Sequence, residues 1–502
     1  MSVDPRTPVL VGAGTASQRF EDPASGLEAA ALMAAACAEA GSPGLLRTAG
    51  LILVPRGTWR YHDAGRLVGA LVGNTTARTV LAELGVLQTS LIERACSLIA
   101  AGDVDVALVV GGEAKWRDLR QTITGRPAPS TDDTGAEPDE VMRRESDVVD
   151  PAEVAAGLGG YSAVNHYAVI ENARRWADGQ SLEEHQATVA GLWEGFSAVA
   201  AANPEAWHRT PMAASDIRTP GPANKPLAWP YNKWHTSQWN VDQAACLILC
   251  SAEAARAHGV PADQWVFPHA IAWSDHMVPV SHRRAIHRSP GFRLAGRAAF
   301  GLVGAGPDDI AHADLYSCFP IAVRTQALEL GLGADRALTV TGGMTFAGGP
   351  LNNYVLQSTA RMASVLRRDP DALGLVTAVS GMLTKQGVSI WGCRPPAVGF
   401  RSADVTAADA ESTGRVPLVT EATAATTATD AAGPPTPAGP ATVAGYTVVA
   451  GGDAPDRAVV VVDLGDDRRA LASSTDPGLT AAMREEEWCG RSVVLDGGGG
   501  FS

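Results

Sequence analysis

The chain has few cysteines for its length, and their spacing excludes two common classes of protein. Its 502 residues contain seven cysteines, at positions 37, 96, 246, 250, 318, 393 and 489. They are too sparse and scattered for a disulfide framework, and none forms a CxxC pair or a Cys/His cluster with zinc spacing. We therefore expect no metal site, and a reduced cytoplasmic protein is the simplest interpretation.

An excess of positive charge is also missing. The chain carries 40 Lys and Arg against 54 Asp and Glu, a formal charge of −14. General nucleic-acid binding needs a dense basic surface that releases counterions, so the composition argues against it. No apolar run reaches the roughly 18 residues of a membrane span, and the start of the chain lacks the parts of a secretory signal. We expect neither nucleic acid nor a membrane as partner.

Motifs of common cofactor sites are lacking as well. There is no Walker A, G-x-S-x-G or HExxH sequence. Gly12-Ala-Gly14 follows a predicted strand, but the third glycine and the acidic residue of a dinucleotide-binding turn are missing. The sequence thus predicts no covalently bound cofactor, and Gly12 to Gly14 is not expected to bind a dinucleotide.

Short apolar runs alternate with helical patterns, which indicates a parallel α/β architecture. The runs are continuous in Val, Ile and Leu, as is typical of strands buried on both faces. In the first part of the chain we predict strands at 9–12, 51–54, 79–81, 106–112 and 244–250, and helices at 26–40 and 88–101. A similar order returns with strands at 266–273, 311–316, 338–342, 375–379 and 388–392, and helices at 294–302, 321–330 and 353–367.

The repeated layout divides the chain into parts. Residues 1–116 and 236–260 form a first half, 117–235 an inserted and largely helical lid, and 261–400 a second half. Ala422 to Thr442 is almost entirely Ala, Thr, Gly and Pro, which cannot bury a core, so 401–442 is predicted to be a linker. Residues 443–502 contain short strands separated by Gly and Asp turns and predict a small β-barrel.

Three polar or glycine-rich segments lie at the ends of predicted strands of the second half. They are DLYSCFP at 314–320, TGGMTFAGGP at 341–350 and SGMLTKQ at 380–386. Ligands of α/β sheets bind at the carboxyl ends of strands, so these segments are candidates for one site. The alternative is structural: Cys318 would be a small buried apolar residue, and the glycines would form a tight loop.

In this order and spacing, the three segments resemble those of a thiolase, and among thiolases the sterol-carrier-protein branch. The resemblance covers about residues 5–400 and includes GDVDVALVVGGEA at 102–114 and WNVDQAACLILCSAEAA at 239–255. It implies a thiolase fold, with two βαβαβαββ halves related by pseudo-twofold symmetry and a lid over coenzyme A. The last residues resemble the small OB-like domains that accompany some thiolase-like proteins.

Thiolase chemistry requires two cysteines and a histidine. One cysteine thiolate at a helix N-terminus attacks the thioester, another moves the α-proton, and the histidine helps to form an oxyanion hole. The resemblance places the nucleophile at Gly85 or Val86, the histidine of the GHP motif at Gly349, and the second cysteine at Val379 or Ser380. None of these residues carries a thiol or an imidazole.

Other residues in the same segments remain candidates for catalysis. Tyr316 takes the place of the Asn or His that begins its motif, and Gln386 takes that of a histidine after the GMLTK-type segment. Cys318 is the one cysteine in the site region; it is either a relocated nucleophile or a residue packed under the site. Lys385 is a candidate for polarising a thioester carbonyl, so Tyr316, Cys318 and Lys385 form the candidate catalytic set.

Coenzyme A binding requires cations for its phosphates. Arg283, Arg284 and Arg288 lie close together in sequence and are the candidates, with Gly348 and Gly349 at the thioester; the alternative is a solvated basic loop. Trp229, Trp234 and Trp239 are candidates for lining a groove, with core or lid packing as the alternative.

Three functions follow as hypotheses. The chain binds coenzyme A or an acyl-CoA in lipid or steroid metabolism without thiolase activity, or it is an acyltransferase or lyase with a rearranged site, or it is a scaffold that recruits a partner enzyme through its C-terminal domain. Thiolases pair through the strand before the nucleophile, so a homodimer is the default expectation. That segment, ARTVLAELGV, is altered at its end, so a monomer is the alternative.

Overall fold

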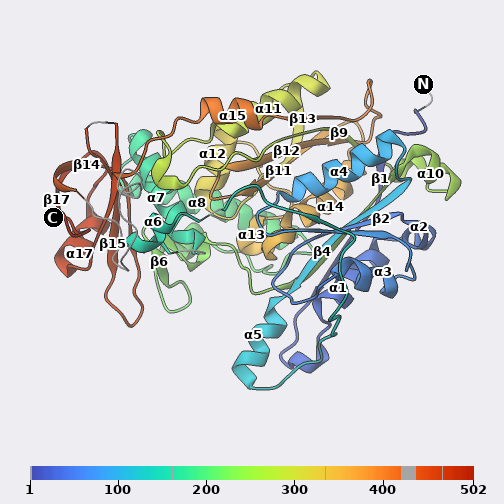
Figure 1. Cartoon of the computed structure of the whole chain (residues 1–502), viewed down its shortest axis with the longest axis horizontal. Helices are drawn as coiled ribbons and strands as arrows, with labels where there is room; N and C mark the ends of the chain where they lie inside the picture. The colour runs from blue at the N-terminus through green and yellow to red at the C-terminus, as the bar shows by residue number, and fades with distance from the viewer. Residues whose placement is uncertain (1–2, 148, 160–161, 334, 420–436, 466) are drawn as a thin grey trace.

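The computed structural model of the chain describes residues 3–147, 149–159, 162–333, 335–419, 437–465 and 467–502. Within them, the strands form three sheets, one in each α/β half and one that contains the C-terminal strands. The two halves lie side by side, and the C-terminal β domain stands at the far end of the molecule next to the helices of the lid (Figure 1).

The strands of the N-terminal half are buried on both faces, as their apolar runs predict. Leu51 and Leu53 belong to one hydrophobic core, whereas Ile52 and Val54 belong to another. The strand order is β1-β8-β4-β2-β3-β5, with β8 antiparallel to its neighbours and β2 parallel to both of its own. The bounds are β1 Pro8–Gln18, β2 Leu51–Pro55, β3 Arg78–Ala82, β4 Val106–Ala114, β5 Glu140–Met142 and β8 Asp242–Ser251.

The sheet of the C-terminal half has the order β10-β11-β12-β9-β13. Strand β11 is parallel to β10 and antiparallel to β12. The bounds are β9 Phe267–Ser274, β10 Ile310–Asp314, β11 Leu373–Ser380, β12 Lys385–Gly392 and β13 Arg401–Asp404.

Two helices lie between the sheets and contact strands of both, namely α4 (Gln88–Ala101) and α14 (Tyr354–Leu366). The remaining helices of the halves pack on the outer faces or at the edges. They are α1 Ala29–Ala40, α2 Pro43–Thr48, α3 Ala64–Leu71, α10 Ala252–Ala257, α11 Pro290–Val303 and α12 Pro320–Leu330. The short α13 (Gly343–Phe346) contacts the lid instead.

The prediction of a strand at 338–342 is wrong. Backbone N–H groups of this segment donate to a side chain rather than to a neighbouring strand. The carboxylate of Asp314, at the end of β10, is fully buried. Its Oδ1 accepts from the backbone N–H groups of Val340 and Thr341, at 2.8 and 3.0 Å. Its Oδ2 accepts from the hydroxyls of Tyr354 and Ser358, at 3.1 and 2.5 Å. Asp314 therefore joins β10, the 339–341 loop and α14.

Replacing Asp314 by Asn should destabilise the C-terminal half, because an amide nitrogen cannot accept the bonds that one carboxylate oxygen accepts now. Leaving buried donors unsatisfied costs about 3 kcal/mol, which is expected to lower the Tm by about 5 °C or more. Scanning calorimetry measures the shift. The exposed Asp308→Asn is the matched control and should leave the Tm nearly unchanged; equal Tm values for the two variants would contradict the role of Asp314.

The residues predicted as a lid are largely helical, but one part of them joins the first sheet. The helices are α5 Lys115–Thr124, α6 Pro151–Glu153, α7 Ala163–Ala177, α8 Leu182–Ala202 and α9 Ala214–Arg218. Between α5 and α6, strand β5 pairs in parallel with β3, matching Val80 with Glu140. The outer edge of β3 is thus covered by the chain itself.

The C-terminal strands pair with the lid rather than standing apart. The bounds are β14 Ala438–Val449, β15 Arg457–Asp463, β16 Arg469–Ser474, α17 Pro477–Glu485 and β17 Ser492–Asp496. Strand β14 pairs with β15 and β17. At its end it also pairs with β6 (Pro226–Ala228), which forms a hairpin of the lid with β7 (Tyr231–Asn232). Arg175 of α7, fully buried, pairs with Glu487 at 2.7 Å.

The predicted linker 401–442 is structured at both ends. Residues 401–404 form β13, which pairs with β9, and α15 (Thr406–Ser412) packs against α11. Strand β14 begins at Ala438, before the predicted start of the barrel at 443. Composition misleads at these ends because pairing with an existing strand stabilises segments that have little apolar side chain of their own. Residues 420–436 of the predicted linker lie outside the described residues.

Among the described residues, no helix combines the length and the apolar character that crossing a bilayer requires.

Candidate functional site

The position that the resemblance assigns to the nucleophile lies immediately before α4, at the contact between the two halves. Gly85 has a φ of 105°, a conformation that favours glycine. Its carbonyl oxygen accepts a hydrogen bond from Nζ of Lys385 at 3.1 Å and a longer one from Oγ of Ser380 at 3.5 Å. The predicted position of the nucleophile therefore presents a backbone carbonyl to a lysine, and it offers no group that can attack a thioester.

Lys385 reaches this position from the hairpin that joins β11 to β12, where it pairs directly with Ser380. Its side chain is buried, and burial lowers the pKa of its amine, although the carboxylates of Asp275 and Glu145 oppose this. The hairpin turn is held by Arg283, which donates to the carbonyl of Met382 at 2.6 Å. Lys385 is thus a constrained donor at the start of α4.

Tyr316 and Cys318 follow β10 and precede α12, as the sequence predicts. Burial raises the pKa of the Cys318 thiol to about 12, and the Tyr167 hydroxyl of the lid, which hydrogen-bonds to it, only partly offsets this. At neutral pH such a thiol is protonated, and the thiolate is the nucleophilic form. The ring of Tyr316 packs edge-to-face on that of Tyr354, with centroids 5.7 Å apart. In this conformation Cys318 is buried, and burial favours the protonated thiol.

The position of the GHP histidine is tightly enclosed. A Cβ atom on Gly348, whose φ is 106°, would lie 2.0 Å from Oε1 of Gln243. A Cβ atom on Gly349 would lie 3.2 Å from the side chains of Met344 and Ser237. A side chain at Gly348 would require the Gln243 side chain to move, and one at Gly349 would require Met344 or Ser237 to shift slightly. Val379, at one of the two predicted second-cysteine positions, is buried in β11.

The three arginines predicted to bind phosphates do not converge. Arg283 is buried and donates to backbone carbonyls, and burial lowers the pKa of its guanidinium to about 10. Arg284 points to the C-terminal domain, where it pairs with both carboxylate oxygens of Asp467 at 2.7 and 2.9 Å. Arg288 pairs with Glu329 at 2.6 and 3.0 Å. Each cation already has a partner within the protein.

The three tryptophans predicted to line a groove also lie in different places. Trp229 lines a cleft of about 350 Å³ between α8 and the β6–β7 hairpin. Trp234 stacks on Phe346, with centroids 6.3 Å apart. Trp239 is half exposed and lies under the Lys115 ammonium. They do not form one groove.

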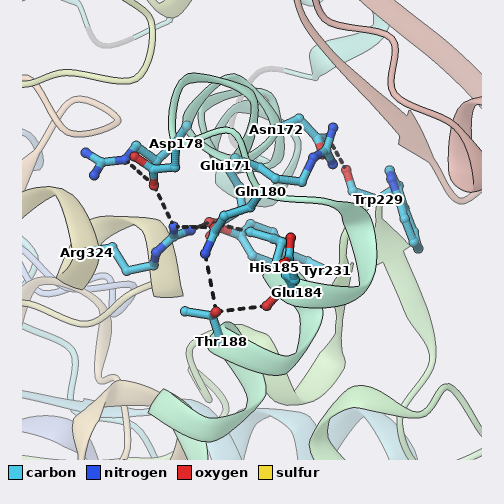
Figure 2. A network of polar contacts seen from close by, with 12 residues as sticks. Glu171, Asn172, Asp178, Gln180, Glu184, His185, Thr188, Trp229, Tyr231 and Arg324 are labelled. Carbon is cyan, nitrogen blue, oxygen red and sulfur yellow. Dashed lines mark hydrogen bonds and ion pairs between the residues drawn. The ribbon is translucent and has the colours of Figure 1, made fainter. Parts of the chain in front are cut away.

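A buried ionic network, absent from the sequence-based expectations, joins the lid to the C-terminal half (Figure 2). Glu171 of α7 is fully buried and accepts from His185 at 2.9 Å and from Tyr231 at 2.6 Å. Arg324 of α12 donates to the same carboxylate and, at 3.0 Å, to Asp178. These residues lie far apart in sequence and have no motif spacing, so only folding brings them together.

Burial by itself would raise the pKa of Glu171, but Arg324, His185 and Tyr231 outweigh it and lower the pKa to about 2. An unfolded glutamate has a pKa of about 4.3. The network therefore stabilises the fold fully above about pH 4.3, and this stabilisation is lost as the pH falls towards 2.

Replacing Glu171 by Gln should lower stability at pH 7 by about 3 kcal/mol, because Arg324 and His185 lose a buried anionic partner. It should also flatten the loss of stability between about pH 4.3 and 2, since the titrating group is gone. Thermal unfolding recorded at a series of pH values measures both effects. Glu183→Gln, on the exposed first turn of α8, is the control and should keep the wild-type slope; a wild-type slope in Glu171→Gln would refute the assignment.

Among the described residues, no group of three or more His, Cys, Asp and Glu side chains is placed to hold a metal ion.

Comparison with known proteins identifies the fold. No protein-family model matches the chain, and no curated protein matches it significantly. Among solved structures, it is similar to a monomeric SCP2-thiolase like protein type 1 (STLP1) from Mycobacterium smegmatis, with 27% identity, a TM-score of 0.81 and 100% of both chains covered. An Ltp2-ChsH2(DUF35) aldolase matches at 18% identity and a TM-score of 0.58, over 78% of this chain and 100% of the other. Human mitochondrial 3-ketoacyl-CoA thiolase matches at 16% identity and 0.53, over 78% of this chain and 99% of the other.

The chain therefore has the thiolase fold, which confirms the fold class predicted from its sequence. Within this fold it resembles the SCP2-thiolase-like proteins, since the similarity to STLP1 extends over the full length of both chains.

Proposed function

We propose that this protein binds coenzyme A or an acyl-CoA, in lipid or steroid metabolism, without performing thiolase chemistry. One contact carries the proposal that thiolase chemistry is absent. At Gly85, where the resemblance assigns a thiolate, the backbone carbonyl accepts a hydrogen bond from Lys385. The enclosed Gly349 and the protonated, buried Cys318 support the same conclusion. The first part rests on the thiolase fold, which the chain shares with acyl-CoA enzymes.

Purified protein should bind coenzyme A in a calorimetric titration, yet it should neither cleave acetoacetyl-CoA nor gain an acetyl group from acetyl-CoA. The reason is that no accessible thiolate is available to take the acyl group. Mass spectrometry of the intact protein detects an adduct, with an active thiolase treated in parallel as control.

An acetyl adduct, or a lack of coenzyme A binding, would contradict this proposal. An adduct or turnover that disappears in Cys318→Ala and Tyr316→Phe would instead favour the second candidate, an acyltransferase or lyase with a rearranged site. The hydrogen bond of Tyr167 to Cys318 and the lowered pKa of Lys385 are the observations that keep this candidate open.

We also propose that the protein is a monomer. Thiolases pair through the strand before the nucleophile, which is β3 here, and β5 already occupies the outer edge of β3. An edge whose backbone groups are paired cannot accept a strand from a second chain. The structure of STLP1, which the chain resembles along its whole length, is described as monomeric.

Light scattering coupled to size exclusion should give the mass of one chain, 52.0 kDa, at micromolar concentration. A dimer that persists on dilution would contradict the argument from β5. Replacing Met142 of β5 by Pro should weaken the pairing of this short strand, because the backbone of Met142 faces β3 and its carbonyl accepts from the N–H of Glu83. A mass that rises in Met142→Pro but not in Met142→Thr would show that β5 blocks pairing.

A further inference from the structure

An open groove runs between α8 of the lid and α12 of the C-terminal half, away from Gly85 and Lys385. Its volume is about 750 Å³, within the range of small-molecule sites. Helix α8 contributes positions three or four residues apart, which share one face of a helix. They are Thr188, Gly191, Leu192, Gly195, Phe196 and Val199.

Two glycines in the middle of α8 keep this groove open. Glycine costs a helix interior about 1 kcal/mol relative to alanine, so two of them call for a reason. Close packing of a neighbour is the usual one, but a Cβ atom built on Gly191 or Gly195 meets nothing within 4 Å. What the glycines provide instead is space, because longer side chains at these positions would project into the groove.

The walls and floor of the groove are largely apolar. Phe196 is almost fully buried beneath it, whereas Leu328 of α12 is 45% exposed. Leu192, Val199, Leu332 and Leu338 complete the apolar surface. An elongated apolar groove of this kind suits a flexible alkyl chain.

The ionisable residues that line the groove are three arginines and one aspartate, although the chain as a whole has a charge of −14. Arg324 donates to Asp178 at 3.0 Å (Figure 2), and Arg174 donates to the same carboxylate at 2.8 Å. Nη1 of Arg174 is buried and finds no hydrogen-bond partner among the described residues. Arg336 donates to backbone carbonyls and not to a carboxylate. Of these three guanidinium groups, that of Arg174 therefore has a donor without a partner among the described residues.

We propose that this groove binds an amphiphile with an alkyl chain and an anionic group, its chain along Gly191 and Gly195 and its anion at Arg174. A free fatty acid has both parts. An acyl-CoA has the same alkyl chain, and its negative charge lies on the phosphates of coenzyme A. The proposal goes beyond coenzyme A recognition, and it can be tested separately because a fatty acid carries no nucleotide.

Calorimetric titration with dodecanoate, dodecanol, dodecanoyl-CoA and coenzyme A tests the groove in the full-length protein. Gly195→Leu should weaken dodecanoate binding about tenfold or more, because the leucine takes the place of several methylenes of the ligand. Gly195→Ala is the matched control for helix propensity and should have a much smaller effect. Gly301→Leu, at an equally open glycine of α11 outside the groove, should bind like the wild type.

The charged end is tested by Arg174→Gln, which should weaken dodecanoate binding while leaving dodecanol binding unchanged. An unchanged or higher Tm in Gly195→Leu shows that the variant is folded. Dodecanoyl-CoA binding that is weakened by Gly195→Leu would identify the thioester as the source of the chain, whereas an effect on dodecanoate alone would identify a free fatty acid.

Failure of dodecanoate to bind, or equal binding by Gly195→Leu and the wild type, would overturn the proposal. So would self-association of the wild type that Gly195→Leu abolishes, since the groove would then be an interface between copies of the chain. Coenzyme A binding without dodecanoate binding would leave the proposed function intact and refute the groove.

Discussion

The buried carboxylate of Asp314 holds together the segments from which the candidate site is built. It fixes the loop at 339–341 through backbone N–H groups and the start of α14 through Tyr354. The same Tyr354 packs against Tyr316, and the glycine-rich loop begins at Thr341. A buried carboxyl group has to be hydrogen-bonded, and here the donors come from elements that would otherwise be independent. The shape of the site follows from this local requirement.

Around this anchor, burial and internal hydrogen bonds determine the state of the side chains in the thiolase-like segments. Cys318 keeps its proton because the thiolate would be poorly solvated, and Lys385 turns to a backbone carbonyl rather than to an open site. The arginines of 283–288 serve the contact with the C-terminal domain, the hairpin turn and Glu329. These side chains are therefore engaged in contacts within the protein. A small cavity of about 210 Å³ remains beside Thr341 and Gly348, and a larger groove lies between α8 and α12.

The lid is firmly attached to the C-terminal half and to the C-terminal domain. Glu171 joins it to α12 by a buried ion pair, Arg175 joins it to Glu487, and the β6 hairpin extends the C-terminal sheet. Breaking such contacts would leave buried charges unpaired, which is costly. The lid, the C-terminal domain and the second half should therefore move together, if they move at all.

The sequence by itself determined most strands and the longer helices of both halves, because their apolar periodicity reports burial directly. It also determined the thiolase fold, through the order and spacing of 314–320, 341–350 and 380–386. It did not reveal the loop at 338–342, where Val340 resembles a strand residue but bonds to Asp314. Nor could it show that β5 covers β3, that the arginines are already paired, or that Glu171 meets Arg324. These contacts join residues that are distant in the sequence and meet only when the chain folds. Ion pairs and strand-edge pairing depend on which groups then share the low-dielectric interior, so only the tertiary structure decides them.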